Sequence, residues 1–170
     1  HDIESPSIFV EFKVKKTKGI RELKNASLLI WTTTPWTLPA NLAICVSPYL
    51  TYSIVETNRG KLVVAADLLN TLQTRLNLGE VKVISEIKGT DLEKVTYTHV
   101  LTKKEHMLIL GDHVSAEDGT GLVHTAPGHG EDDFKVGQKY GLPAFSPIDS
   151  RGVLTQDAGD FAGLFFEDAN

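Results

Sequence analysis

The apolar residues of this chain come in many short runs separated by turn residues, and this pattern constrains the fold more than any other feature. Runs of about four to eight residues that are rich in Val, Ile, Leu and aromatic residues are typical of strands. We expect strands at residues 7–14, 27–33, 41–47, 51–57, 61–65 and 81–87, within 95–101, and at 106–114 and 119–125. So many strands favour a mainly β (α+β) fold, which we expect to be a closed β-barrel with peripheral helices.

Two segments have helical rather than strand periodicity. Residues 66–76 place four leucines on one face, and residues 131–140 place Val136 and Tyr140 on one side. No repeat, heptad pattern or linker interrupts the chain, so residues 1–170 are expected to form a single domain.

Composition argues against several classes of protein. No stretch approaches the roughly 18 consecutive apolar residues of a membrane span. The net charge of −5 argues against a protein that coats nucleic acid, although it is compatible with binding a short single-stranded end. The only cysteine, Cys45, has no partner for an internal disulfide, which predicts a reducing, intracellular compartment. The chain starts at His1 without a signal peptide or an initiator Met, so we expect a piece of a larger protein.

The first segment that suggests chemistry is WTTTPWTLPAN, residues 31–41. Three threonines run from a buried strand into a segment with two prolines, so we expect 34–40 to be a rigid, irregular loop. Strand geometry puts Thr32 and Thr34 on one face and Thr33 on the other. Hydroxyls held in this way can position a water or a substrate ester without carrying charge. The alternative interpretation is a threonine-rich edge strand followed by a proline turn.

The second segment is GTGLVHTAPGHGEDDF, residues 119–134. Glycines precede and follow His124, and a Gly-His-Gly turn leads to Glu131, Asp132 and Asp133 at the start of a helix. In the structural interpretation the acidic residues cap the helix, and His124 is a hydrogen-bonded strand residue. In the functional interpretation one carboxylate faces a pocket together with His124 and binds a cationic group.

Other candidate sites are weaker. His124, His129 and the following carboxylates match no common zinc spacing, and Cys45 lies in an apolar strand without a neighbouring acid or base. The chain has neither a Gly-Xaa-Ser-Xaa-Gly nucleophile motif nor a P-loop. One further feature is a basic run, which consists of Lys13, Lys15, Lys16, Lys18, Arg21 and Lys24. Such a run is usually a solvent-exposed face, and the alternative is that it contacts a phosphate backbone.

Together the two segments resemble the editing domain that is inserted into the catalytic domain of isoleucyl-tRNA synthetases. Pro35-Trp36-Thr37 and Pro39-Ala40-Asn41 resemble the isoleucyl version of the threonine-rich motif rather than the valyl or leucyl versions. HTAPGHGEDDF and GQKYGLP resemble bacterial or organellar sequences, which implies a bacterial cytoplasmic or an organellar location.

The resemblance implies hydrolysis of valine that is misattached to isoleucine tRNA, and of misformed valyl-adenylate. Asp133 is then expected to bind the α-ammonium group, while His124 and Trp36 line the side-chain pocket. The residues expected to hold the ester, the terminal ribose or the attacking water are Thr32, Thr33, Thr34 and Asn41, and Trp31 is a further substrate-binding residue. The expected catalytic set is Thr33, Thr34, Asp133 and His124.

The resemblance also implies that editing needs no metal, no cofactor and no covalent intermediate. ATP serves only the full-length synthetase, whose remaining part and isoleucine tRNA are the expected partners. A second pocket is needed to reject valine, because one methylene changes the binding free energy by only about 1–3 kcal/mol. Discrimination between isoleucine and valine in this family is the standard example of this limit. The two signatures of the synthetase active site, His-Ile-Gly-His and Lys-Met-Ser-Lys-Ser, are absent from the 170 residues, so we expect no aminoacylation by this chain.

Two other classes of function stay open. One is a module that binds the acylated tRNA end and needs the full synthetase for turnover. The other is a metallohydrolase. Release of valine from valyl-tRNA by this chain separates the first from an enzyme, and inhibition by a chelator identifies the second.

Overall fold

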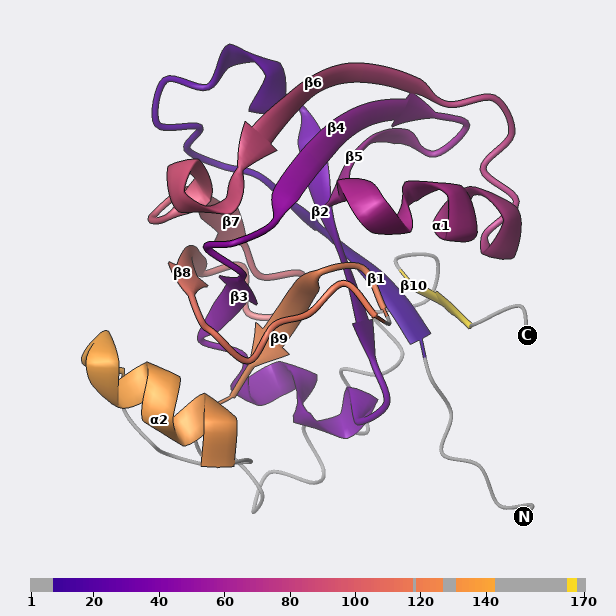
Figure 1. Ribbon diagram of the computed structural model, residues 1–170. Coiled ribbons are helices and arrows are strands. Elements are labelled where there is room, and N and C mark those ends of the chain that lie inside the picture. Colours follow the sequence, from indigo (N-terminus) through magenta and orange to yellow (C-terminus); the bar gives the residue numbers. More distant parts are fainter. Residues whose placement is uncertain (1–7, 118, 127–130, 143–164, 168–170) are drawn as a thin grey trace.

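The computed structural model describes residues 8–117, 119–126, 131–142 and 165–167, with 131–134 and 165–167 described by their backbone only. Figure 1 shows the arrangement of these elements. The strands are β1 (Ile8–Lys13), β2 (Ala26–Thr32), β3 (Ala43–Val46), β4 (Thr51–Thr57), β5 (Gly60–Ala65), β6 (Lys82–Lys88), β7 (Thr96–Thr98), β8 (Glu105–Leu110), β9 (Leu122–Thr125) and β10 (Phe165–Glu167). The helices are α1 (Leu69–Arg75), α2 (Glu131–Lys139) and the 3-10 helices η1 (Arg21–Leu23), η2 (Pro35–Ala40), η3 (Ala66–Leu68) and η4 (Gly89–Leu92).

The described strands form two mixed sheets. One has the order β10-β1-β2-β5-β4-β6, and the other has the order β7-β8-β3-β9. The pairs β2–β5 and β3–β8 are parallel, and the other pairs are antiparallel. The prediction of a mainly β fold is therefore confirmed.

The two sheets meet along one side of the molecule. An isolated bridge joins Val14 to Tyr97, and the Ala65 N–H donates to the Thr120 carbonyl over 2.8 Å. Among the described strands, however, neither sheet closes on itself: β10 and β6 are the outer strands of one, and β7 and β9 of the other. The closed barrel that we expected is not found in this part of the chain.

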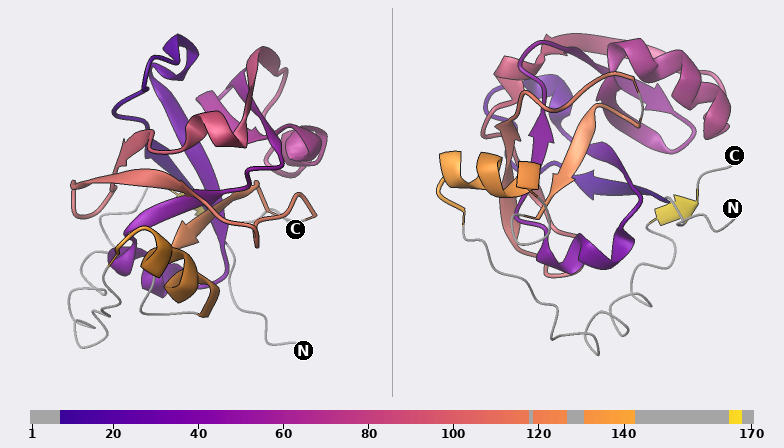
Figure 2. Two further views of the ribbon diagram at one scale, coloured as in Figure 1. Left: turned by 60° about the vertical axis from the view of Figure 1, so that its left-hand side comes forward. Right: turned by 60° about the horizontal axis from the view of Figure 1, so that its bottom comes forward.

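The two α-helices lie on different sides of the strands (Figure 1, Figure 2). Helix α1 continues from η3, so residues 66–75 are helical nearly as predicted, and Leu72 is buried in the main core. Helix α2 packs Val136 against a second apolar cluster that includes Ala43 and Cys45 of β3. The helix predicted at 131–140 is confirmed to within one residue.

Segment 34–40 differs from the prediction of an irregular loop, because Pro35–Ala40 forms the 3-10 helix η2. Pro35 occupies its first turn, where the fixed φ of proline suits a helix and no N–H is needed. The bonds that start and end it are donated by the backbone of Thr37 to Thr34 and of Asn41 to Leu38, both over 2.9 Å. The proline-rich motif is therefore regular and rigid.

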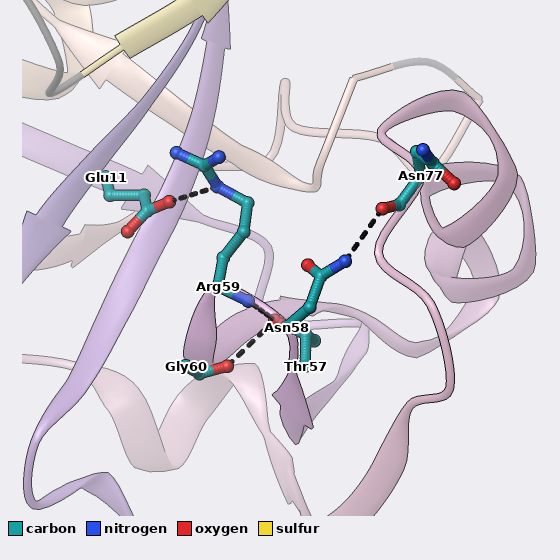
Figure 3. Close-up of polar contacts among 6 residues, drawn as sticks. All are labelled: Glu11, Thr57, Asn58, Arg59, Gly60 and Asn77. Atoms are coloured by element: carbon teal, nitrogen blue, oxygen red, sulfur yellow. Dashed lines mark hydrogen bonds and ion pairs between the residues drawn. The ribbon is translucent and has the colours of Figure 1, made fainter.

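The hairpin between β4 and β5 is tied to both neighbouring elements (Figure 3). The Arg59 guanidinium donates to the Glu11 carboxylate of β1 over 2.7 Å, and the Asn58 amide donates to the Asn77 carbonyl after α1 over 3.0 Å. Within the turn, the Thr57 hydroxyl donates to the Gly60 carbonyl over 2.9 Å. These contacts hold the β4–β5 hairpin against β1 and against the segment that follows α1.

Candidate functional site

A pocket of about 440 Å³ lies where the end of β2, the 3-10 helix η2 and strand β9 meet. The two sequence motifs meet on it. The first motif contributes Trp31, Thr32, Thr33, Thr34, Trp36 and Thr37. The second motif contributes the continuous stretch 119–124, which ends at His124, and His113 and Ser115 complete the wall.

His124 is the buried histidine of this wall, and both of its ring nitrogens have partners. Its Nε2 lies 2.8 Å from the Thr37 hydroxyl, and its Nδ1 lies 2.7 Å from the Asn41 side-chain nitrogen. Strand pairing sets its place, because His124 is opposite Ile44 in the β3–β9 ladder. Asn41, which we predicted to bind the substrate, does not line the pocket; its side chain contacts His124 instead.

The chain of contacts continues behind His124, away from the pocket. The Asn41 nitrogen also donates to the Ala43 carbonyl over 2.8 Å, and the Asn41 oxygen accepts from the Tyr97 hydroxyl. Tyr97 is fully buried, and its ring stacks on Phe12 with the centroids 5.3 Å apart. Burial raises the pKa of the Tyr97 phenol well above its usual value, and the hydrogen bond to Asn41 offsets only part of this. The phenol is therefore a protonated donor at neutral pH.

The three threonines are not equivalent. The Thr34 backbone N–H donates to the buried Thr32 hydroxyl over 3.0 Å, and the Thr32 and Thr34 hydroxyls lie 3.3 Å apart. These two therefore lie together as predicted, but Thr33 is not turned away from the pocket, because β2 ends at Thr32 and all three threonines line it. Thr33 is exposed on the pocket wall and has no side-chain hydrogen bond within the described residues. Its hydroxyl is thus open to a ligand or a water, and Thr34, which is also exposed, lines the pocket beside it.

Two tryptophans border the same pocket. Trp36 is 51% exposed, which is unusual for so large an apolar side chain. Trp31 is more deeply set, and its indole nitrogen is buried without a hydrogen-bond partner among the described residues. The Arg75 guanidinium lies 5.6 Å from the Trp31 ring. A ligand in the pocket would therefore meet the exposed Trp36 side chain, whereas the Trp31 indole nitrogen is buried.

Two glycines are required at the base of the pocket. Gly121 has a φ of +84°, and a β-carbon there would lie 2.5 Å from the Ala65 side chain. Gly119 has a φ of +74°, and a β-carbon there would lie 3.1 Å from the Trp31 ring. Both positions use the left-handed region that favours glycine, so these residues of the motif serve the backbone path.

A second histidine, His99, holds η2 from the opposite side. Its Nε2 lies 2.9 Å from the Leu38 carbonyl, and its Nδ1 accepts from the Leu101 backbone N–H over 2.9 Å. Burial lowers the pKa of His99 to about 4, an effect that the hydrogen bond to Leu38 opposes and the nearby His106 and Lys103 reinforce. His99 is therefore neutral at physiological pH.

The acidic part of the second motif is described only by its backbone. Glu131, Asp132 and Asp133 lie at the start of α2, as predicted, and their side chains are outside the described residues, as is all of His129. The ammonium-binding role of Asp133 therefore stays a prediction. In the part of the chain that is described, no group of three or more His, Cys, Asp or Glu side chains is arranged to hold a metal ion.

Sequence reasoning missed Thr37, Tyr97, His113 and Ser115. Thr37 lies inside a segment that we expected to be an irregular loop, and His113 inside one that we expected to be strand, although β8 ends at Leu110. Tyr97 carries no local signal, because its role depends on a contact with Asn41, 56 positions away.

The chain is 51% identical over 166 residues to the isoleucine–tRNA ligase of Symbiobacterium thermophilum and 49% identical over 169 residues to that of Geobacillus kaustophilus. These matches cover 98% and 99% of the chain but 18% of each relative, so the chain spans about a fifth of their length. No family model matches the chain.

The fold is shared with solved editing domains of another synthetase. The P. knowlesi cytosolic leucyl-tRNA synthetase editing domain has a TM-score of 0.65 at 12% identity, covering 91% of this chain and 67% of that one. The P. falciparum cytosolic leucyl-tRNA synthetase editing domain has a TM-score of 0.62 at 13% identity, covering 79% and 67%. At this identity the likeness concerns the fold alone.

Proposed function

The chain is homologous over nearly its whole length to one segment of bacterial isoleucyl-tRNA synthetases, and from this premise we propose that it is their editing domain, a hydrolase that removes valine from isoleucine tRNA. Its substrates would be the valyl ester at the tRNA 3′ end and misformed valyl-adenylate. The observation that carries the proposal is the meeting of both motifs on one pocket. A volume of about 440 Å³ is in the usual range for a small-molecule site, and it suits an aminoacyl group with part of a nucleoside.

The proposed reaction is hydrolysis of an ester. A water attacks the carbonyl carbon of the valyl group, the bond from that carbon to the ribose oxygen breaks, and the ribose hydroxyl and free valine leave. Thr33 and Thr34 would hold the ester or the water by neutral hydrogen bonds, and their position on the pocket wall supports this role. Asp133 would hold the α-ammonium group, since a charge-assisted bond is about twice as strong as a neutral one.

His124 and Trp36 would select for the smaller side chain. Both line the pocket, and His124 is held by partners on its two nitrogens, so it gives way little to a larger ligand. A rigid wall that accepts valine and excludes isoleucine reverses the test made by a pocket shaped for isoleucine. We propose that editing uses no metal, no cofactor and no covalent intermediate, and that ATP serves only the full-length ligase.

The partners proposed for this chain are isoleucine tRNA and the remaining part of the synthetase. The location proposed is the bacterial cytoplasm or an organelle. No helix in the described part of the chain is long and apolar enough to cross a membrane.

The test is a deacylation assay with this chain. Isoleucine tRNA charged with labelled valine should lose valine faster with the chain than in buffer, and the same tRNA charged with isoleucine should be spared. An excess of chelator should leave the rate unchanged; inhibition would indicate a metallohydrolase. Binding of valyl-tRNA without release of valine would favour the second candidate, a module that needs the full ligase for turnover. This alternative is specific because the chain covers only 18% of the length of the relative.

A further inference from the structure

We infer that Tyr97, Asn41 and Thr37 form a buried chain of hydrogen bonds that holds His124 neutral, with its proton on Nε2, as a fixed wall of the pocket. The selective role of this wall rests on the proposed function, but its protonation does not. Tyr97 and Thr37 are then positioning residues, which act on a ligand through His124.

The orientation of the Asn41 amide is set by a carbonyl. The Ala43 carbonyl oxygen can only accept, and it lies 2.8 Å from one end of the amide, so that end is the NH₂ group. The other end is then the oxygen, which accepts from the Tyr97 hydroxyl. The reversed amide would place two oxygens against each other at 2.8 Å.

The Asn41 orientation determines the tautomer of His124. The NH₂ group uses one hydrogen for Ala43 and points the other at Nδ1 of His124, 2.7 Å away. Nδ1 must therefore carry a lone pair, since a proton there would face another donor. A neutral imidazole with a lone pair on Nδ1 carries its hydrogen on Nε2.

Thr37 leads to the same tautomer independently. Its hydroxyl has a single hydrogen and lies 2.8 Å from the Thr34 backbone carbonyl, which can only accept. That hydrogen is therefore used, and the Thr37 oxygen accepts from Nε2–H of His124 over 2.8 Å. The two ends of the imidazole thus require the same proton position, and no group in the chain is left with a mismatched partner.

The burial of the chain makes it rigid. Tyr97 and Asn41 are almost completely buried, and Thr37 and His124 are each 7% exposed. A buried donor or acceptor that loses its partner has no water to replace it, so the alternative arrangements are unfavourable. His124 consequently presents the edge and face of a neutral ring to the pocket, and it does not take up a proton from the attacking water.

The protonation state is tested by NMR on the ¹⁵N-labelled 170-residue chain at neutral pH. Long-range ¹H–¹⁵N spectra separate the two tautomers and the cation, and His124→Gln identifies the signals of His124. We expect the Nε2–H tautomer in the wild type. Thr37→Val, which is nearly isosteric but has no hydroxyl, should shift His124 to a mixture, and Thr37→Ser should restore the wild-type pattern.

Tyr97→Phe removes only the hydroxyl and keeps the ring against Phe12, so it should also change the His124 signals. The matched control is Tyr140→Phe, which removes a hydroxyl bonded to Glu93 and Leu110 and should leave these signals unchanged. An Nδ1–H or doubly protonated His124 in the wild type would overturn the inference. So would unchanged His124 signals in Thr37→Val.

A second measurement connects the chain to selectivity. In the deacylation assay, Thr37→Val and Tyr97→Phe should lower the ratio of the rate on valyl-tRNA to the rate on isoleucyl-tRNA by about tenfold, while Thr37→Ser keeps it. An unchanged ratio in both variants would refute the positioning role. If the wild-type chain hydrolyses neither substrate, the proposed function fails, and the NMR result still decides the state of His124.

Discussion

Acid should destabilise this protein through His99, and the size of the effect follows from its surroundings. Burial lowers the pKa of His99 to about 4 in the folded state, against 6.5 for an unperturbed histidine. Between these two values the unfolded chain binds a proton that the folded chain does not, so stability falls as the pH falls. The stabilisation that comes from a neutral His99 is fully present above pH ~6.5 and is lost progressively down to pH ~4. The total loss in the free energy of unfolding is about 3 kcal/mol, at about 1.4 kcal/mol per pKa unit.

The structural cause is specific. The His99 ring stacks on Phe12 and has no exposed surface, and a proton on Nδ1 would displace the Leu101 backbone N–H that donates to it. Its other nitrogen holds the Leu38 carbonyl of η2, the helix that contributes Trp36 and Thr37 to the pocket. Protonation keeps this bond, because Nε2–H still donates to the carbonyl, so the cost in acid comes from the buried charge and from the lost bond to Leu101.

The measurement is urea unfolding of the wild type and of His99→Gln at pH 7 and pH 5. From the proton linkage alone, the wild type should lose about 2 kcal/mol more than the variant over this interval. The matched control is His106→Gln, at a neighbouring histidine whose pKa is also lowered by burial. His106 is less buried than His99, so its removal should change the pH dependence less. Equal losses in the wild type and His99→Gln would refute the assignment of a buried neutral His99.

Four further predictions concern the pocket. His124→Ala should admit one more methylene, so that the variant hydrolyses isoleucyl-tRNA at a rate about 10- to 100-fold above the wild type; retained valine selectivity would remove His124 from the wall. Thr33→Val should reduce deacylation and leave the free energy of unfolding nearly unchanged, because the Thr33 hydroxyl has no hydrogen bond among the described residues. Thr32→Val should cost about 1 kcal/mol of stability, because it loses the hydrogen bond from the Thr34 backbone. Normal deacylation in Thr33→Val and Thr34→Val would show that the threonines serve the fold and not the reaction. Asp133→Ala should abolish deacylation with little loss of helix content, and Asp132→Ala should cost much less, as a direct comparison of the two rates will show; sensitivity of Asp132 instead would reassign the ammonium partner. Uncharged tRNA should bind this chain weakly in a salt titration, because a net charge of −5 releases few counterions, and a tight, steeply salt-dependent complex would make the basic run 13–24 a binding surface.

The parts of the fold that depend on local pattern were predictable from the sequence. The strand predicted at 51–57 coincides with β4, and the strand at 27–33 is displaced by one residue from β2. The alternation in 7–14 predicted a half-buried strand, yet Ile8, Phe9 and Val10 of β1 are all buried. The reason is that both faces of β1 are covered by residues distant in sequence: Arg75 lies over the Phe9 ring on one face, and Tyr97 stacks on Phe12 on the other.

The 3-10 helix η2 shows a different limit of sequence reasoning. Two prolines in six residues argue against a regular element when each is counted as a missing donor. In η2 one proline is at the first position, and the hydrogen bonds at the two ends are donated by Thr37 and Asn41. Neither of these bonds therefore needs an N–H group from a proline. The composition of the segment was correctly taken as rigid, but the positions of its donors decided its conformation.

The pocket itself depends on strand register, which no single motif contains. His124 lies opposite Ile44 because β9 pairs with β3 in one register, and the same pairing places it within reach of Asn41 just before β3. A slip of one residue would turn His124 to the other face of the sheet and bring Val123 or Thr125 into its place. Neither can supply a ring N–H to Thr37 and a lone pair to Asn41 at once. The polar chain that ends at Tyr97 therefore favours one register over its neighbours, and a motif that lines the pocket also helps to specify the sheet on which the pocket is built.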